Sequence, residues 1–293
     1  MIKGTDLKTD SLLCRAYLET HPSDAARIIE QLAPEEAAAL LQQFPVQSAT
    51  APVLQLMDTS FGIECLKKWP EEKLPEILSA IDLHTAALMM RRMEPPDRDR
   101  LLARAPEEVT RSLKLLLRYP KNTAGALMDP RILALPEDID VAEACRRIQK
   151  YPEYAYYYIY VVNRVDKLLG FLEIRELLIA SRQALLSSVM RPAKIRISAR
   201  AGLEALMTHP GWRRFYELPV VDDKDILLGI LSYQRLRELE QDTAAKTPNP
   251  VLNTAIALGE LYWVGAASLI RSLGGAFKSD SAKSNTKESR NAN

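Results

Sequence analysis

The sequence LLGFLEI at residues 168–174 recurs about sixty residues later as LLGILSY at residues 227–233. Each copy is a short apolar run with one internal glycine, which is typical of a buried β-strand. A second apolar run precedes each copy, at Ile159–Val162 and at Leu218–Val221, and polar turn residues join the two runs. A duplicated strand–turn–strand unit is therefore predicted in the second half of the chain.

The duplication extends to both sides of these strands. Met128-Asp-Pro130 precedes the first unit as Met190-Arg-Pro192 precedes the second. Each strand pair leads into a predicted helix, over Arg175–Ala180 in the first unit and Gln234–Glu240 in the second. Several correspondences in one register predict two units of the same fold that pack as a pair.

Before residue 120 the sequence follows a different pattern, in which proline precedes acidic residues and then an Ala/Leu-rich apolar stripe. Proline suits the first position of a helix, and carboxylates in the first turn complement the helix dipole. We interpret these acids as capping residues; a cation site is the alternative. Short helices cannot bury an apolar face alone, so they are expected to stack. The pattern begins at Pro34, Pro70, Pro75, Pro96 and Pro106.

The bulk composition argues against several classes of function. The net charge is +1, from 39 basic and 38 acidic residues among 293, so nothing indicates a nucleic-acid partner. The three histidines are isolated and lack a neighbouring nucleophile, so we expect no enzyme activity. Cys14, Cys65 and Cys145 lie far apart, and we expect buried, reduced thiols. The polar N-terminus carries no signal peptide, which favours a cytoplasmic location.

The duplicated unit resembles a CBS domain, and the helical region resembles the N-terminal domain of MgtE magnesium channels. The junction at 119–128, YPKNTAGALM, is similar to the corresponding junction of that family. The resemblance implies an α plus α/β fold, with an all-α superhelix of short helices followed by a tandem CBS pair. We place the superhelix at residues 11–120 and the CBS domains at 121–186 and 187–246. CBS pairs commonly dimerise through their helices, so we expect a homodimer.

The resemblance also implies ATP or another adenine nucleotide in the CBS cleft. In the family an aromatic residue on the first strand, an Arg–Asp pair and a second aromatic hold the nucleotide. The candidate residues here are Tyr158, Arg175, Glu176, Phe215, Pro219 and Ser232. The ribose-binding signature of CBS domains is degraded in both repeats. The alternative is that Tyr158 and Phe215 are core aromatics and Arg175 is a surface cation.

Magnesium is the second ligand that the resemblance implies. Mg²⁺ prefers carboxylate and water oxygens in an octahedral arrangement. The acid-rich stretch of the family is reduced here to DLHTAAL at residues 82–88, and arginines stand near the later acids. The remaining candidate ligands are Asp82, Glu238, Glu240 and Asp242. The alternative is that each of these acids is an ordinary solvent-exposed charge. We therefore expect weakened Mg²⁺ sensing.

An apolar segment follows the CBS pair. Residues 249–277 are predicted to form an amphipathic helix, and residues 278–293 a disordered tail. The helix has three alternative roles: contact with a membrane surface, docking on another protein chain, or packing on the CBS pair. Its contact residues would be Leu252, Ile256, Tyr262, Trp263 and Ile270. About fifty residues follow the CBS pair, too few for the five-helix pore of the family, so we expect no transport by this sequence alone.

These features predict a non-catalytic, cytoplasmic regulatory module. Its alternative is a ligand-independent scaffold that acts by protein–protein contacts, including contacts at a membrane complex through residues 251–277. The two hypotheses differ in whether the CBS cleft takes a ligand.

Overall fold

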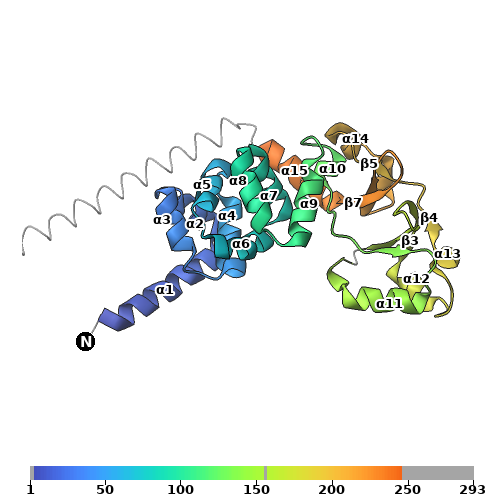
Figure 1. The fold of residues 1–293 in the computed structure, drawn as a ribbon, viewed down its shortest axis with the longest axis horizontal. Helices are drawn as coiled ribbons and strands as arrows, with labels where there is room; N and C mark the ends of the chain where they lie inside the picture. Colours follow the sequence, from blue (N-terminus) through green and yellow to red (C-terminus); the bar gives the residue numbers. More distant parts are fainter. Residues whose placement is uncertain (1–2, 155–156, 246–293) are drawn as a thin grey trace, which may run out of the picture. The chain divides into compact units, whose positions relative to one another are not determined.

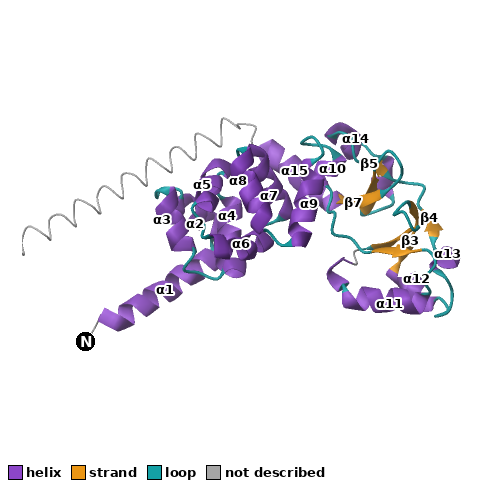
Figure 2. Ribbon diagram, viewed as in Figure 1, coloured by secondary structure: helices purple, strands orange, loops and turns teal. Residues whose placement is uncertain are grey.

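A computed structural model describes residues 3–154 and 157–245 of the chain. Helices make up the region up to residue 117, and short strands and helices alternate after it (Figure 2). The chain divides into two compact units, residues 1–236 and residues 237–293. The features described below lie in the first unit, apart from the last turns of the final helix.

The helical region consists mostly of helices of two or three turns (Figure 1). They are α1 (Lys3–Thr20), α2 (Pro22–Ile29), α3 (Pro34–Leu41), α4 (Ala51–Leu56), α5 (Thr59–Lys67), α6 (Leu74–Ala80), α7 (Leu83–Arg92), α8 (Pro95–Arg104) and α9 (Glu107–Leu117). Helix α3 contacts α5, α5 contacts α7, and α7 contacts α9. Isolated helices of this length are only marginally stable, so contacts between stacked helices stabilise the region. The predicted all-α superhelix is confirmed.

Two helix starts in this region repeat the same set of contacts. The carboxylate of Asp58 caps α5 and that of Asp82 caps α7, each by accepting two backbone N–H groups of the first turn. The backbone N–H of Asp58 donates to Glu30 at 2.5 Å, and that of Asp82 donates to Gln55 at 3.1 Å. These side chains therefore tie each capped turn to a preceding helical segment.

Most of the proline patterns begin α-helices as predicted: α3 starts at Pro34, and α9 starts directly after Pro106. Pro70 is the exception, because it precedes a single 3₁₀ turn, Glu71–Lys73. The reason is Pro75, which has no N–H to donate to the carbonyl four residues earlier. The α-helix begins only at the residue before Pro75, so one of the predicted helix starts was wrong.

The second region contains two small sheets with matching topology. The strands are β1 (Ala134–Pro136), β2 (Tyr158–Val162), β3 (Leu168–Glu173), β4 (Arg191–Pro192), β5 (Ile197–Ser198), β6 (Glu217–Val221) and β7 (Leu227–Ser232), and the helices are α10 (Ala124–Leu127), α11 (Val141–Lys150), α12 (Ile174–Ile179), α13 (Leu186–Val189), α14 (Leu203–Met207) and α15 (Tyr233–Ala245). In each sheet a parallel pair, β1–β2 or β5–β6, adjoins an antiparallel hairpin, β2–β3 or β6–β7. The two strand hairpins predicted from the duplication are confirmed.

The two repeats exchange short extended segments at the glycines of the duplicated motif. Strand β4, which opens the second repeat, pairs with β3 so that Gly170 lies opposite Pro192. In the first repeat Asp129 pairs with Ile230 of β7, through backbone hydrogen bonds of 2.7 and 2.9 Å. A Cβ atom on Gly170 would lie 2.6 Å from the Arg191 carbonyl oxygen. The glycines are therefore needed because another backbone approaches closely.

The turns of the two hairpins also pair with each other. Asp166 and Asp225 both adopt a left-handed backbone conformation, with φ of 59° and 65°, which Asp tolerates better than most residues. The N–H of Leu168 donates to the Asp225 carbonyl, and that of Leu227 donates to the Asp166 carbonyl, both at 2.9 Å. This reciprocal pairing joins the repeats at a second place.

An apolar cluster fills the space between the repeats. It contains side chains from both, namely Tyr160, Leu168, Ala193, Val221 and Ile230, and each of them is buried. The hydrophobic contacts and the exchanged backbone segments act on the same interface. The repeats are therefore held as one body.

Several predictions concern the ends of the chain. The amphipathic helix at 249–277 with its five contact residues, and the tail at 278–293, lie outside the described residues. Among the helices that the structure describes, none combines the length and the apolar character needed to cross a membrane.

The expectation of buried thiols is correct for Cys65 and wrong for Cys14. Burial raises the pKa of the Cys65 thiol to about 12. Cys14 is exposed because α1 presents most of its described side chains to solvent, including Leu12 and Leu13. Cys145 is half-buried.

Replacing Gly229 by alanine tests the close approach of the exchanged segments. The added Cβ would lie 2.5 Å from the Asp129 carbonyl oxygen, so the backbones have to separate. We expect a loss of about 1–3 kcal/mol in the free energy of unfolding, as for other overpacked sites. The control is Gly202→Ser, because no atom lies within 4 Å of a Cβ there. Equal denaturant midpoints for the two variants would contradict the prediction.

Candidate functional site

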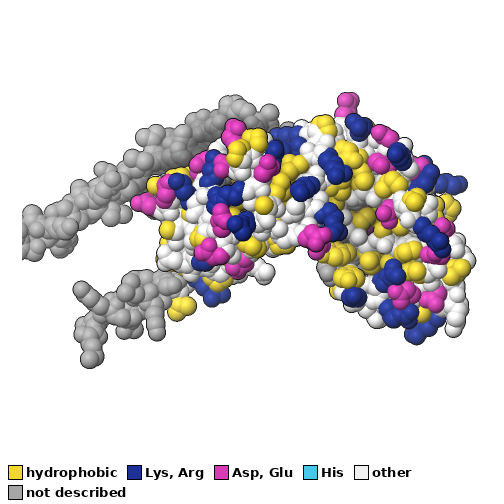
Figure 3. Space-filling view, in the orientation of Figure 1, with side chains coloured by type: hydrophobic (Ala, Val, Ile, Leu, Met, Phe, Trp, Pro, Cys, Tyr) yellow, Lys and Arg dark blue, Asp and Glu magenta, His cyan; other side chains and the backbone are white. Residues whose placement is uncertain are grey.

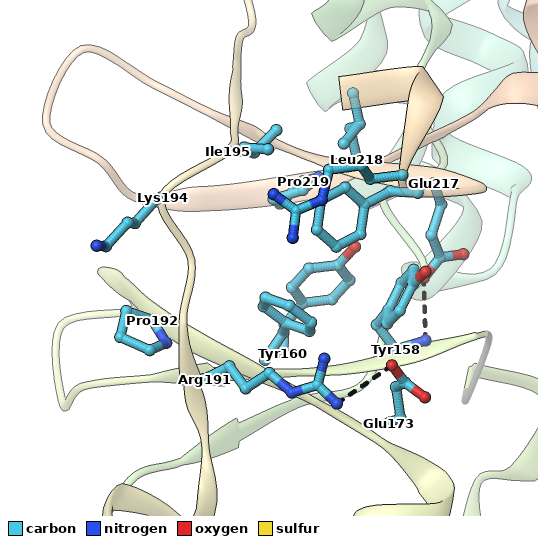
Figure 4. A pocket seen from close by; sticks show the side chains of 13 residues that line it. Tyr158, Tyr160, Glu173, Arg191, Pro192, Lys194, Ile195, Glu217, Leu218 and Pro219 are labelled. Atoms are coloured by element: carbon cyan, nitrogen blue, oxygen red, sulfur yellow. Dashed lines mark hydrogen bonds and ion pairs between the residues drawn. The ribbon is translucent and has the colours of Figure 1, made fainter. Parts of the chain in front are cut away.

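A cavity of about 280 Å³ lies between the strands of the two repeats (Figure 4). This volume is near the lower end of the range for small-molecule pockets. The first repeat supplies Tyr158, Tyr160, Phe171 and Glu173, and the second supplies Arg191, Pro192, Lys194, Ile195, Arg214, Phe215, Glu217, Leu218 and Pro219. The cavity therefore exists only when the two repeats are packed together.

Three aromatic rings form one apolar wall of the cavity. The ring centres of Tyr158, Phe171 and Phe215 are 5.5–5.7 Å apart in each pair. The interplanar angles of 69–85° show edge-to-face packing, which is a favourable arrangement for aromatic pairs. A flat ligand ring that enters between Tyr158 and Phe215 would exchange these contacts for stacking.

Glu217 is a buried carboxyl group on the cavity wall. It is the first residue of β6 and is 1% exposed. One of its oxygens accepts a hydrogen bond from the Tyr158 backbone N–H at 3.3 Å. Burial raises the pKa of Glu217 to about 7, although nearby backbone N–H groups act in the opposite direction. Both the neutral and the ionised forms of this side chain are therefore populated near neutral pH.

The hydroxyl group of Tyr160 lies beside Glu217 on the same wall (Figure 4). Tyr160 is 3% exposed, and its hydroxyl makes no hydrogen bond of ordinary geometry within the described part of the chain. Burial and the neighbouring Glu217 raise the pKa of Tyr160 well above its usual value, so the hydroxyl keeps its proton. An unpaired buried hydroxyl is unfavourable, and a polar ligand atom would satisfy it.

Cationic side chains line another part of the cavity. Arg191 is held by two carboxylates: its guanidinium donates to Glu176 through Nε at 2.8 Å and lies 3.4 Å from Glu173. Lys194 and Arg214 also line the cavity, and neither forms an ion pair with a described side chain. The Arg214 guanidinium lies over the Phe215 ring, 5.9 Å from its centre. Two cations are thus available to an anionic ligand.

The structure brings half of the predicted ligand residues to the cavity. Tyr158, Phe215 and Pro219 line it. Arg175 lies outside the lining and is 73% exposed, with its Nε 2.7 Å from Glu173. Glu176 and Ser232 also lie outside the lining. Glu176 accepts the Glu173 backbone N–H at 2.9 Å, and the Ser232 hydroxyl accepts the backbone N–H of Arg235 at 3.2 Å.

Sequence reasoning missed several cavity residues. Arg191, Lys194, Arg214 and Glu217 come from segments that the duplication pattern treats as turns or strand ends. One signal was present in the sequence: Glu217 is a charged residue directly before the apolar run Leu-Pro-Val-Val, at the start of the strand. All five residues of that strand are buried.

The candidate metal ligands are not brought together among the described residues. No group of three or more His, Cys, Asp or Glu side chains there has an arrangement suited to a metal ion. Asp82 is engaged in capping α7. Its backbone and side-chain contacts at the start of α7 hold the pKa of Asp82 well below its usual value, despite burial. Glu238 and Glu240 are exposed on α15, and the side chain of Asp242 lies outside the described set.

Lys/Arg and Asp/Glu side chains are interspersed on the face shown in Figure 3. This mixed surface agrees with the nearly neutral net charge.

The stability of the protein should depend on pH through Glu217. Because its folded pKa is raised from 4.5 to about 7, the folded state binds the proton more tightly than the unfolded state does. The free energy of unfolding therefore falls as the pH rises from about 4.5 to 7, by an amount on the order of 3 kcal/mol. Glu217→Gln should remove this fall.

Denaturation of both proteins between pH 5 and pH 8 measures the effect. The stability of Glu217→Gln relative to the wild type should increase with pH, and Glu204→Gln, which changes an exposed carboxylate on α14, should show no such trend. A stability difference between Glu217→Gln and the wild type that is independent of pH would contradict the prediction.

Comparison with known proteins places this architecture in a family. The family model described as the MgtE intracellular N domain matches residues 20–122, and the CBS domain model matches residues 124–182. These ranges coincide with most of the helical region and with the first repeat. The match to the helical region is independent of the match to the repeat.

Two curated relatives carry both regions. The magnesium transporter MgtE of Thermus thermophilus is 30% identical over 219 residues, which are 73% of this chain and 48% of the transporter. The magnesium transporter MgtE of Bacillus subtilis is 24% identical over 231 residues, or 76% of this chain and 51% of the transporter. The chain thus spans about half the length of the curated relatives it matches.

A solved structure is similar over the same region. It is the cytosolic domain of the Mg²⁺ channel MgtE in complex with ATP, with a TM-score of 0.66 and 28% sequence identity. The similarity covers 80% of this chain and 96% of that domain. The order of the helical region and the two repeats, the two family matches and this structural similarity together show that the chain belongs to the MgtE family through its intracellular N domain and CBS pair.

Proposed function

We propose that this chain is a non-catalytic regulatory module in which the CBS pair binds an adenine nucleotide. The observation that carries the proposal is the cavity itself, with an aromatic wall at Tyr158 and Phe215 and the cations Lys194 and Arg214 in the same lining. An aromatic wall suits the flat face of a base, and guanidinium and ammonium groups suit phosphate. The related MgtE cytosolic domain was crystallised with ATP, which supports the same ligand class here.

We propose that Lys194 and Arg214, rather than Arg175, bind the phosphate groups. Arg175 is directed to an ion pair with Glu173 and is largely exposed. Arg191 is already neutralised by Glu173 and Glu176. Lys194 and Arg214 line the cavity without an ion-pair partner among the described side chains. An anionic ligand would therefore gain most from these two residues.

We also propose that Mg²⁺ sensing through the acids of the helical region is weak. Asp82, which remains from the acid-rich stretch of the family, already accepts two backbone N–H groups as a helix cap. The cap engages Oδ2, so this single carboxylate offers a cation only Oδ1, whereas Mg²⁺ prefers several oxygen ligands in an octahedral arrangement.

We also propose that the chain forms a homodimer through α12. Such a protein–protein contact is consistent with the scaffold alternative as well. Leu178 and Ile179 on this helix are 76% and 86% exposed. Ile174, on the same helix, is 39% exposed. Adjacent exposed apolar side chains of this size are typical of interaction surfaces. We propose a second copy of the chain as the partner.

Titration of the purified full chain with ATP, ADP and AMP, followed by calorimetry and by the melting temperature, tests nucleotide binding. A ligand that binds the native state raises the melting temperature by mass action. Phe215→Ala should weaken binding roughly 5- to 150-fold, because base–aromatic stacking contributes about 1–3 kcal/mol. Tyr216→Ala is the matched control, since the neighbouring Tyr216 is 68% exposed and lies outside the lining.

The same titration separates the two assignments of the phosphate site. Arg214→Ala and Lys194→Ala should each weaken ATP binding more than adenosine binding, whereas Arg175→Ala should have little effect. The opposite order would restore the assignment that the family resemblance implies. No binding of any nucleotide by the wild type at millimolar concentration would leave the scaffold alternative.

Sedimentation velocity of the full chain tests the homodimer. Leu178→Glu should shift the protein toward the monomer, because it places a charge at the centre of the apolar surface. Ile28→Glu is the control, since Ile28 is 54% exposed on α2 in the helical region. A wild-type monomer, or equal effects of the two variants, would contradict the proposal.

A further inference from the structure

Two buried polar side chains face the cavity without a full set of partners. Glu217 accepts from the backbone N–H groups of Tyr157 and Tyr158, the latter at 3.3 Å, and the neighbouring Tyr160 hydroxyl has no hydrogen bond of ordinary geometry among the described residues. Both are at most 3% exposed, and both line the cavity beside the aromatic wall. Most buried polar groups in proteins have hydrogen-bond partners, so this pair requires an explanation. A ligand held against the aromatic wall would supply a partner for the Tyr160 hydroxyl and a further one for Glu217.

The hydrogen-bonding capacity of Glu217 depends on its protonation. A neutral carboxyl group presents one O–H donor and one carbonyl acceptor side by side, whereas a carboxylate only accepts. The neutral form therefore offers the same pair of groups as a glutamine amide. A glutamine amide recognises adenine by two hydrogen bonds. The amide oxygen accepts from the amino group of adenine, and the amide N–H donates to the adjacent ring nitrogen of adenine. The equivalent edge of guanine carries two acceptors and does not match this pair.

We propose that Glu217, in its neutral form and assisted by the Tyr160 hydroxyl, determines base specificity by pairing with the amino group and the adjacent ring nitrogen of an adenine-type base. This assignment rests on the proposed nucleotide function and adds the residue that reads the base. Tyr158, Phe215 and Glu217 line the same cavity (Figure 4). A base stacked on either ring would therefore lie next to the Glu217 carboxyl group.

Other charged and titratable groups also lie near Glu217. They are Tyr157, Tyr158 and Tyr160 before and on β2, Glu173 on β3, Arg191 on β4, and Lys194, Arg214 and Tyr216 in the second repeat. Burial raises the pKa of Tyr158 and of Tyr160 above 10, so neither ionises below pH 8. Binding of a neutral nucleoside should therefore follow the protonation of Glu217.

Calorimetric titration of the full chain with adenosine at pH 6, 7 and 8 tests the assignment. Adenosine is the probe because it carries no phosphate that titrates in this range. The wild-type affinity should fall about tenfold from pH 6 to pH 8, since a group with a pKa near 7 is mostly neutral at the lower pH and mostly ionised at the higher.

The variants make the test specific. Glu217→Gln keeps the donor–acceptor pair without a titrating group, so its affinity should change less than twofold over the same range. Glu217→Leu should bind adenosine weakly at every pH, and Tyr160→Phe should bind it more weakly than the wild type does. Glu204→Gln, the same chemical change on exposed α14, should retain the tenfold fall. Melting curves establish that each variant is folded.

The outcomes for the two proposals differ. Wild-type protein that binds no adenosine or adenine nucleotide at any pH refutes the proposed nucleotide function. Wild-type binding that Glu217→Leu leaves unchanged, or a tenfold pH dependence that persists in Glu217→Gln, refutes the role of Glu217 alone.

Discussion

The exchange of short backbone segments at Gly170 and Gly229 is the constraint on which the cavity depends. Strand β4 reaches β3 of the other repeat because Gly170 has no side chain in its path. This pairing carries Arg191 and Pro192 to the cavity, where they meet aromatic residues of the first repeat. If the segments separated, the second repeat would lose contact with that wall. Two glycines thus determine whether a ligand site exists, although neither lines it.

The duplicated fold has lost its symmetry at the site. The register that aligns the glycines also aligns Tyr158 with Glu217 and Phe171 with Ile230. Backbone contacts are reciprocal between the repeats, including the paired turns at Asp166 and Asp225. The side chains around the cavity are not reciprocal. The first repeat supplies two rings of the aromatic wall, and the second supplies the buried carboxyl group of Glu217 and the two cations without an ion-pair partner among the described side chains. One cleft therefore combines stacking, charge and hydrogen bonding.

The fold could be predicted from the sequence because it follows from local rules that repeat. Glycine, turn residues and apolar runs recur in one register, so the hairpins were identified correctly. The family resemblance implied three of the residues that line the cavity, Tyr158, Phe215 and Pro219. Lys194 and Arg214 lie on segments without a repeated pattern, so only the packed structure brings them to the cavity. Arg175 is exposed and forms an ion pair with Glu173, and neither feature follows from its residue type.

Asp82 illustrates why acid-rich patterns in short helices are ambiguous. A carboxylate at the start of a helix gains hydrogen bonds from the first turn and a favourable interaction with the helix dipole. Those hydrogen bonds engage one carboxylate oxygen, Oδ2, and stabilise the negative charge of Asp82. A cluster of carboxylates responds to Mg²⁺ only when the charges repel one another in its absence. A single capped aspartate has no such repulsion to relieve, so the same residue stabilises the superhelix whether or not the ion is present.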